Sequence, residues 1–489
     1  MIEKDGKGPA LVWFRDDLRL ADNPAVAEAT AGGRPAIFLY VLEDRTAGVR
    51  PLGAAASWWL HHSLSALSAD VAARGGRLRI RRGDARKVVP AAAREAGAGL
   101  VAWNRRVGEA ASVDADVEAA LRRARVAVRA FKANRLYEPD EVASKGGTPF
   151  RVFTAFWRAA LARGEPRPPL PAPAKFARAT GVLKSEALES LGLLPQAPDW
   201  STGIRALWTP GEAGAAARLA TFAEGAIRAY AERRDVAGEV STSMLSPHLR
   251  FGEVSPFQVW HAVAGVAGRG AEKFRAELGW REFAYHVLAQ FPALARENLR
   301  PEVDAFPWQE PYADEMWAWR RGRTGYPIVD AGMRQLWQGG WMHNRVRMIV
   351  ASFLTKHLLA PWQFGEEWFW DTLVDADPAS NPFNWQWVAG SGADAQPYFR
   401  IFNPVTQGET FDPDGAYVRR FVPEIAALPD RYIHRPWEAP PLELAAAGVS
   451  LGRDYPEPIV DHAEARRRAL AAFEEMRAAS RISSESAAP

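Results

Sequence analysis

The 489-residue sequence contains no cysteine. This absence excludes a disulfide scaffold, a zinc ribbon, a Cys-ligated iron–sulfur cluster and a cysteine nucleophile. Long apolar runs are missing too, because no stretch of 18 apolar residues occurs, and residues 1–10 lack the apolar segment of a signal peptide. We therefore expect a cytoplasmic protein that does not span a membrane.

Lysine is scarce, since it supplies only 9 of the 61 basic residues and arginine supplies the rest. The net charge is only +3. Such a bias is compatible with a GC-rich genome and also with phosphate binding, because guanidinium groups match phosphate oxygens. The positions of the arginines, rather than the overall charge, must decide between these two interpretations.

Common catalytic signatures are absent as well. The sequence has no HExxH motif, Walker A loop or serine-hydrolase elbow, and its nine histidines show no ligand spacing, so we expect no metal site. Residues 390–395 fit the pattern GxGxxA but do not follow a predicted strand, so we interpret this match as a coincidence.

Strands and helices alternate in residues 1–135. Short apolar runs predict strands over residues 10–14, 36–42, 78–81, 100–103 and 126–131. Alanine-rich stretches between them predict helices over residues 24–31, 54–74, 85–96 and 113–124. This alternation predicts an α/β domain with a doubly wound, five-stranded parallel sheet.

The chain then changes character. Residues 166–173 read PRPPLPAP, which cannot form a helix or a central strand, so residues 136–211 are predicted to be an interdomain connector. From Glu212 the strand signals vanish, which predicts a larger all-α domain over 212–480. Residues 481–489 are predicted to be a disordered tail.

Tryptophan is abundant, and 11 of the 20 residues fall between Trp280 and Trp387. Most of them are expected to pack in a core. The segment WQW at 385–387 is different, because it places two indoles on different faces of one element. One can line a cavity while the other packs inward.

Polar clusters lie in the same Trp-rich stretch. Glu277 and Arg281 have helical i,i+4 spacing, as do Asn344 and Met348, and Asp375 and Asp377 precede Asn381. Each cluster alone suits a helix surface or a capping device, but charges embedded in apolar sequence require a partner or a polar ligand. The hydroxyl-rich loop at 241–246 suits an anion or simple N-capping.

Several long segments resemble the photolyase/cryptochrome family over nearly the whole chain, nearest to the class I photolyases that act on cyclobutane pyrimidine dimers. These are LVWFRDDLRL at 11–20, ELGWREF at 277–283, GYPIVD at 325–330, GWMHNR at 340–345, WQW at 385–387 and PYFRIFNP at 397–404. The resemblance implies an antenna domain over 1–135 and a helical FAD domain over 212–480.

The resemblance also implies the residues that bind one FAD, active as FADH⁻. They are Tyr230, Thr242, Ser243, Met244, Leu245, Ser246, Phe274, Arg281, Asn344, Arg347, Asp375, Ala376, Asp377 and Asn381. Among them, Asp375 is expected to pair with Arg347, and Asn381 to face flavin N5, where an amide adds no negative charge.

By the same resemblance, the activity is light-driven DNA repair in which reduced FAD passes an electron to a flipped-out pyrimidine dimer and the cyclobutane ring splits. The implied catalytic residues are Glu277, Asn344, Met348 and the two walls Trp280 and Trp387. The implied DNA contacts are Arg234, Glu277, Trp280, Asn344, Arg345, Arg400 and Gln407.

The resemblance implies electron transfer through Trp385, Trp362 and Trp308, although Trp317 and Trp319 are sequence neighbours of the last. An antenna chromophore, methenyltetrahydrofolate or a deazaflavin, is also implied. Residues 103–110 are about one residue shorter than in folate-binding relatives, and Glu109 is the candidate pterin contact.

Three alternatives follow from the resemblance. Enzymes that repair the (6-4) photoproduct carry His at the positions of Asn344 and Met348, which argues against that substrate here. A blue-light cryptochrome with little repair is the main alternative, and a structural flavoprotein leaves the Glu277 cluster unexplained. We expect a monomer without an obligate protein partner, associated with the nucleoid when it binds UV-damaged DNA.

Overall fold

The computed structural model describes residues 8–144, 146–179, 183–394 and 400–486. The chain divides into two compact units. Unit 1 comprises Met1–Arg228, Thr242–Ala293 and Val374–Asp377, and unit 2 comprises Ala229–Ser241, Leu294–Leu373 and Pro378–Pro489. The predicted sheet lies in unit 1, and most of the Trp-rich segment lies in unit 2.

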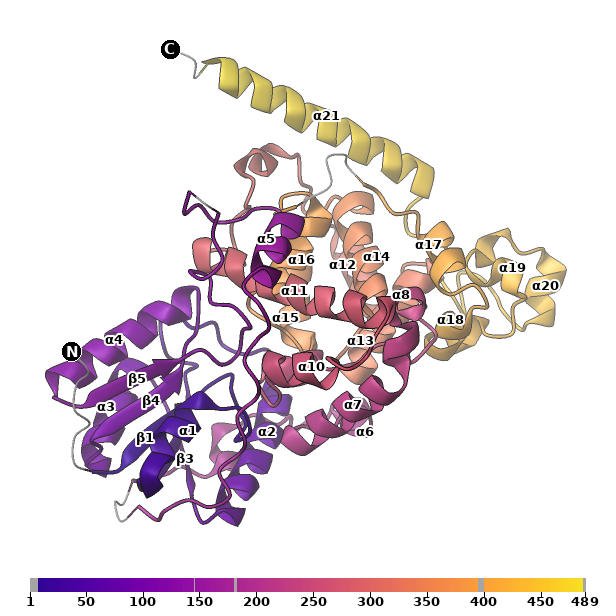
Figure 1. Cartoon of the computed structure of the whole chain (residues 1–489). Coiled ribbons are helices and arrows are strands. Elements are labelled where there is room, and N and C mark those ends of the chain that lie inside the picture. Colours follow the sequence, from indigo (N-terminus) through magenta and orange to yellow (C-terminus); the bar gives the residue numbers. More distant parts are fainter. Residues whose placement is uncertain (1–7, 145, 180–182, 395–399, 487–489) are drawn as a thin grey trace. The chain divides into compact units, whose positions relative to one another are not determined.

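Unit 1 contains a five-stranded parallel sheet in the order β3-β2-β1-β4-β5 (Figure 1). The strands are β1 (Ala10–Phe14), β2 (Ala36–Leu42), β3 (Leu78–Arg82), β4 (Leu100–Asn104) and β5 (Ala127–Phe131). The prediction of a five-stranded parallel sheet is therefore confirmed, and each strand end agrees with the sequence to within one residue.

Four helices cover the sheet, namely α1 (Pro24–Thr30), α2 (Ala54–Ala73), α3 (Ala85–Ala96) and α4 (Glu109–Arg123). Leu11 and Trp13 of β1 point to one face and pack there in a core with Val89 of α3 and Val117 of α4. Helices α1 and α2 lie on the other face (Figure 1). Because successive strand residues point to opposite faces, both faces are apolar, as a doubly wound sheet requires.

The remaining helices confirm the predicted helical region. Unit 1 adds α5 (Phe153–Leu161), α6 (Thr202–Leu207), α7 (Glu212–Glu224), α9 (Ser246–Arg250), α10 (Pro256–Ala262) and α11 (Arg269–Gln290). Unit 2 contains α8 (Tyr230–Arg233), α12 (Ala313–Arg321), α13 (Pro327–Gly339), α14 (Asn344–Ser352), the π-turn η5 (Phe353–His357), α15 (Trp362–Thr372), α16 (Ser380–Ala389), α17 (Pro404–Phe411), α18 (Ala416–Phe421), α19 (Asp430–Ile433), α20 (Pro441–Ala446) and α21 (His462–Ser486). Beyond β5, the β-structure of the described residues is a single bridge between Leu451 and Tyr455.

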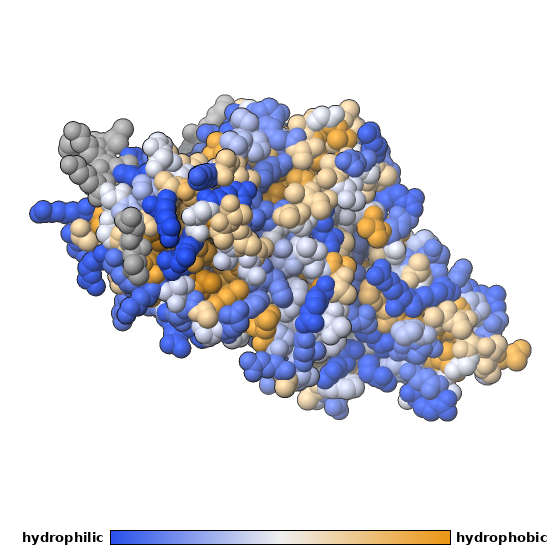
Figure 2. Space-filling model, turned by 90° about the horizontal axis from the view of Figure 1, so that it is seen from below, coloured by the Kyte–Doolittle hydropathy of each residue, from blue (hydrophilic) through white to orange (hydrophobic). Residues whose placement is uncertain are grey.

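The C-terminal segment ends in α21, which continues to Ser486 and so covers 481–486 of the predicted tail. The final three residues lie outside the described part. Among the helices that the structure describes, none combines the length and apolar character needed to cross a bilayer. Figure 2 shows one face of the molecule, on which hydrophilic side chains lie beside apolar patches.

Candidate functional site

Helix α11 of unit 1 carries four of the predicted site residues, Phe274, Glu277, Trp280 and Arg281. Helical i,i+4 spacing puts Glu277 and Arg281 on one face, as expected. The Glu277 carboxylate lies 3.1 Å from Nζ of Lys273, and both side chains are partly exposed. Arg281 donates to the backbone oxygen of Asn134 at 2.8 Å, so α11 is tied to the segment that follows β5.

The Trp280 ring stacks on Phe153 of α5, with centroids 3.8 Å apart and an interplanar angle of 10°. Helix α5 approaches α11 closely beside this pair, because a Cβ on Gly279 would lie 2.6 Å from the Trp157 ring. One face of the Trp280 indole is thus fixed by protein. A ring held in this way is a rigid apolar surface, and its contact with a flipped base stays a prediction.

The predicted flavin residues near 375–377 are also fixed within unit 1. The Tyr285 hydroxyl donates to Oδ2 of Asp377 at 2.6 Å, and Nε of Arg250 donates to the backbone oxygen of Ala376 at 2.7 Å. Asp375 and Asp377 are both buried. Carboxylates buried in this way suit a polar ligand with hydrogen-bond donors.

The hydroxyl-rich loop leads into α9, which begins at Ser246, as the sequence predicted. Met244 has a left-handed φ of 51°, and Leu245 N donates to Oγ of Ser243 at 3.4 Å. Thr242 and Ser243 are half-buried. Phe274 is buried against Phe222, with centroids 4.6 Å apart, so it forms an apolar wall within unit 1.

In unit 2, Asn344 is the first residue of α14 and Met348 follows one turn later on the same face. Asn344 is exposed and Met348 is half-buried. Arg345 lies between them and pairs with Asp235 at 2.7 Å. Arg347 donates from Nε to the oxygen of Met342 at 2.8 Å, and its pairing with Asp375 stays a prediction.

His343 caps α14, because its Nδ1 accepts a hydrogen bond from Arg345 N at 3.2 Å. Burial lowers the pKa of His343 to about 4, although Asp235 acts in the opposite direction. The imidazole is therefore neutral near pH 7 and can serve as the acceptor. The cap fixes the turn that presents Asn344.

The side-chain amide of Asn381 is fixed by Glu366 of α15. Its Nδ2 donates to Oε1 of Glu366 at 2.9 Å and to the backbone oxygen of that residue at 3.1 Å. Glu366 is fully buried. With Nδ2 engaged there, the amide oxygen is the part of Asn381 that is left to accept a ligand N–H.

The WQW segment lies in α16, where one indole is buried and the other is half-buried. Trp385 is buried, and its ring makes edge contacts with Phe369 and Trp319. Trp387 is half-buried and lines a cavity of about 640 Å³. Gly390 ends the helix with a φ of 100°, so the first glycine of the GxGxxA match is a helix cap.

The other two predicted electron carriers are also in unit 2. Trp362 is fully buried and its indole N–H donates to Oδ1 of Asn298 at 2.8 Å. Trp308 is only half-buried and donates to the oxygen of Val303 at 3.3 Å. This difference in burial suits a chain that ends near the surface, but the order of transfer stays a prediction.

The predicted DNA contacts outside α11 and α14 are dispersed in unit 2. Tyr230, a predicted flavin residue, is buried, and the Arg234 guanidinium lies 5.4 Å from its ring centroid. Arg400 is exposed, and the preceding residues 395–399, part of a family segment, lie outside the described residues. Oε1 of Gln407 is buried and has no hydrogen-bond partner among the described residues, so it is available to a ligand donor.

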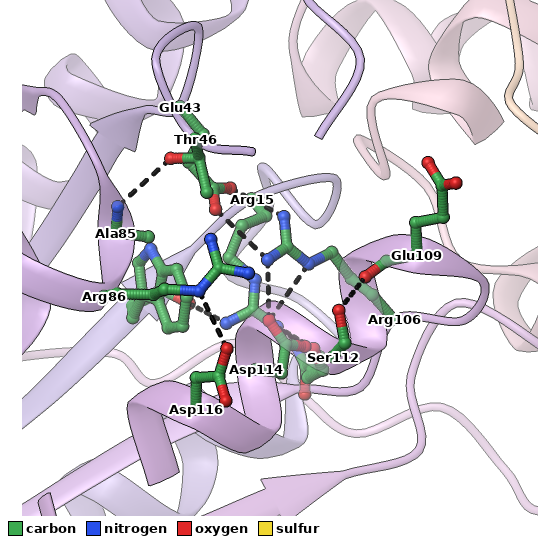
Figure 3. A network of polar contacts seen from close by, with 12 residues as sticks. Arg15, Glu43, Thr46, Ala85, Arg86, Arg106, Glu109, Ser112, Asp114 and Asp116 are labelled. Atoms are coloured by element: carbon green, nitrogen blue, oxygen red, sulfur yellow. Dashed lines mark hydrogen bonds and ion pairs between the residues drawn. The ribbon is translucent and has the colours of Figure 1, made fainter. Parts of the chain in front are cut away.

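The carboxyl edge of the sheet is the first place to expect an antenna chromophore, because ligands of open α/β sheets bind where the strand order reverses. Here that point lies between β1 and β4. Arg106 pairs with Glu43 and Asp114, both at 2.6 Å, and Arg15 pairs with Asp114 at 3.2 Å (Figure 3). These charges neutralise one another.

The folate alternative depends on Glu109, which begins α4 and is half-buried. Gly108 before it has a φ of 68°, and a Cβ there would lie 3.1 Å from Leu288 of α11. The turn is therefore closely packed within unit 1. The identity of the antenna chromophore stays a prediction. Among the described residues, no group of three or more His, Asp or Glu is placed to hold a metal ion.

Sequence reasoning missed the partners that orient the predicted residues. They are Phe153, Arg250, Lys273, Tyr285, Asn298, Trp319 and Glu366. Two left a signal: Tyr285 follows Arg281 by one helical turn, and Glu366 is a carboxylate in the aromatic segment WQFGEEWFW. The others are joined by tertiary contacts that local spacing does not reveal.

Comparison with known proteins supports the same interpretation. A family model described as the FAD binding domain of DNA photolyase matches residues 274–475, and one described as DNA photolyase matches residues 10–174. The deoxyribodipyrimidine photo-lyase of Agrobacterium fabrum is 53% identical over 95% of this chain and 97% of its own. The chain belongs to the photolyase/cryptochrome family.

Other members of this family show its range. Cryptochrome-1 of Arabidopsis thaliana is 38% identical over 98% of this chain and 72% of its own. The crystal structure of a bacterial class III photolyase from Agrobacterium tumefaciens has a TM-score of 0.92 and 51% identity, over 97% of this chain and 99% of that one. The sequence motifs had favoured class I, whereas this similar structure is described as class III.

Proposed function

We propose that this chain is a light-dependent DNA repair enzyme, a deoxyribodipyrimidine photo-lyase, that splits cyclobutane pyrimidine dimers. The Asn344 and Met348 pair carries this proposal, because both side chains share one face at the start of α14. An amide and a thioether can bind and pack against a pyrimidine dimer, but neither is the proton-transferring histidine that a (6-4) substrate requires.

The chain's own residues would bind and orient the substrate. Trp280, fixed on Phe153, and Trp387 would form apolar walls for the flipped dimer. The Glu277 carboxylate would accept a hydrogen bond from a ring N–H and keep the dimer oriented. Four residues would contact the DNA backbone or the pocket edge: Arg234, Arg345, Arg400 and Gln407.

FAD fits the described donor set. Hydroxyls of the 242–246 loop and Tyr230 would bind the phosphates, and Asp377 and Asn381 would bind the ring system. When bound in the reduced state, FAD supplies one electron on excitation and regains it after two C–C bonds of the cyclobutane ring have broken. Trp385, Trp362 and Trp308 would supply electrons that keep FAD reduced.

The expected partner is UV-damaged DNA, which an arginine-rich protein can hold through phosphates. We propose that the protein acts as a cytoplasmic monomer, at the nucleoid when it binds damage. An antenna chromophore of the folate type is proposed over a deazaflavin, because the sheet edge is closed by its own ion pairs.

The lesion preference is tested with two oligonucleotides, one with a single cyclobutane thymine dimer and one with a single (6-4) photoproduct. Under blue light, the reduced, FAD-loaded protein is expected to restore the first and leave the second, as measured by liquid chromatography. Repair of the (6-4) substrate would overturn the assignment. Repair of neither would favour the photoreceptor function, which the relation to cryptochromes makes the second candidate.

A further inference from the structure

Three exposed aromatic side chains lie on or beside α12 and α13, two helices of unit 2 that pack against each other. Trp317 of α12 is 55% exposed and Trp337 of α13 is 52% exposed, and Tyr312 at the start of α12 is more exposed still. The other large apolar residues with such exposure in the described part of the chain are aliphatic. Half-exposed indoles cost free energy in water and commonly mark a binding surface.

Side chains from α12, α13 and α15 form an ordered stack. The Trp337 ring lies parallel to the Trp368 ring, with centroids 6.2 Å apart and an interplanar angle of 4°. The Arg321 guanidinium lies 5.7 Å from the Trp337 ring centroid, and the Arg320 guanidinium lies 5.0 Å from that of Trp368. We call these four side chains the Trp337 platform.

Within the part of the chain that the structure describes, no acidic side chain pairs with the arginines of the platform. Arg320, Arg321 and Arg323 end α12 or follow it, and none of them has an acidic partner among the described residues. Nε of Arg320 is buried without a hydrogen-bond acceptor in the same part of the chain. By contrast, Arg334 of α13 pairs with Glu424 at 2.7 Å.

We propose that the Trp337 platform binds single-stranded DNA, at a site separate from the residues assigned to the lesion. An exposed indole offers a flat apolar face on which an unpaired base can stack, and stacking tolerates any base. Duplex DNA cannot use that face, because its bases are already stacked on one another. The arginines add phosphate contacts through their planar forks.

None of the platform residues belongs to the set assigned to FAD, the lesion or electron transfer, so this site does not depend on the dimer-repair function. A photolyase with such a platform could hold an unpaired strand of the same DNA molecule while the lesion residues act on the damage. The binding is predicted to be independent of light and of flavin oxidation state.

The test is fluorescence anisotropy with lesion-free, labelled dT16, in the dark, on the full-length FAD-loaded protein. Trp337→Ala is expected to weaken dT16 binding by about tenfold, within the range measured for removal of a single base stack. Trp337→Phe, which keeps a ring, is expected to retain most of the affinity. Arg321→Glu is expected to reduce the slope of log K against log salt by about 0.7 for each phosphate that the variant no longer binds.

Leu442→Ala is the matched control for the apolar change, because Leu442 is a highly exposed residue of α20. Arg453→Glu is the control for charge, because Arg453 is an exposed arginine that pairs with Asp454. The proposal would be overturned if Trp337→Ala left the dT16 affinity unchanged and Arg321→Glu left the salt slope unchanged. Equal losses in the two control variants would overturn it as well. If the platform bound a protein and did not bind dT16, the proposal would also be overturned.

Dimer repair in a short duplex is measured in parallel and is expected to be unchanged in the platform variants. A protein that binds dT16 through the platform but repairs no dimer would leave this inference standing and remove the proposed function. The two failures are therefore distinguishable.

Discussion

Two of the sets of buried polar groups in this protein are built differently. At the edge of the sheet, Arg15, Glu43, Arg106 and Asp114 neutralise one another (Figure 3). In the candidate functional region, polar groups are instead oriented by single hydrogen bonds or by one residue: the Tyr285 hydroxyl donates to Asp377, and Asn381 donates to Glu366.

The difference separates a structural network from a ligand-binding one. A closed set of ion pairs satisfies its own charges and lacks capacity for a ligand, and opening it costs stability. A carboxylate or amide that is oriented by a hydrogen bond and pairs with no opposite charge has a set orientation, and its other lone pairs can accept hydrogen bonds from a ligand. The variants below are chosen to test whether the two sets respond differently, from the largest expected effect to the smallest.

Arg106→Ala should have the largest effect on stability. It leaves the buried carboxylates of Glu43 and Asp114 without their 2.6 Å partners, and removing one member of a buried pair costs about 3–5 kcal/mol. Urea unfolding should show the loss, while repair per folded molecule stays unchanged.

Arg86→Ala is the matched control, because Arg86 pairs with Asp116 at 2.8 Å on the surface of unit 1. An exposed ion pair contributes at most about 1 kcal/mol to the free energy of unfolding. Equal destabilisation by the two substitutions would contradict the distinction between the networks.

The fold was largely predictable from the sequence because its signals are local. Strands such as 36–42 and helices such as 85–96 show clear runs and boundaries, and the structure reproduces them. For the candidate site, the sequence predicts which residues take part but not which neighbouring side chains orient them. Nothing in the local spacing joins Trp280 to Phe153, which lies more than a hundred residues earlier, or Asn381 to Glu366.

His343 should make stability depend on pH. Burial lowers its pKa to about 4 in the folded protein, whereas an unfolded histidine titrates near 6.5. Below pH 6.5 the unfolded chain binds a proton at His343 that the folded chain excludes. The contribution of His343 to the free energy of unfolding is therefore complete above pH 6.5 and is lost as the pH falls toward 4. The loss is about 1.4 kcal/mol per pH unit, up to about 3 kcal/mol.

His343→Asn keeps a side chain that can cap α14 but does not titrate. Urea unfolding of both proteins at several pH values between 4 and 7 should therefore show a smaller decline for the variant. Parallel curves for the two proteins would show that His343 does not cause the decline.

Tyr285→Phe should weaken FAD binding and leave the fold intact. It removes the hydroxyl that donates to Asp377 at 2.6 Å, and a hydrogen bond to a charged group contributes about 1.5–3 kcal/mol. Titration of the apoprotein with FAD should show at least about a tenfold rise in Kd. An unchanged Kd would mean that Asp377 does not need this tyrosine, or does not contact FAD.

Glu277→Ala should lower the yield of dimer repair by about tenfold while FAD stays bound. The substitution removes the protein's charged acceptor for a hydrogen bond from the substrate. Lys273→Ala is the control, since it removes the 3.1 Å ion-pair partner but keeps the carboxylate. Repair and flavin absorbance are measured for both variants. Loss of FAD from Glu277→Ala, or equal loss of repair in Lys273→Ala, would show that the assigned role is wrong.

The central claim is that this member of the photolyase/cryptochrome family repairs DNA with light. The most direct measurement follows the number of cyclobutane dimers in UV-irradiated oligo-dT, with reduced, FAD-loaded protein, under blue light and in darkness. We predict that dimers disappear in proportion to the light absorbed and persist in the dark. Dimers that persist equally in both conditions, with FAD bound and reduced, would contradict the claim.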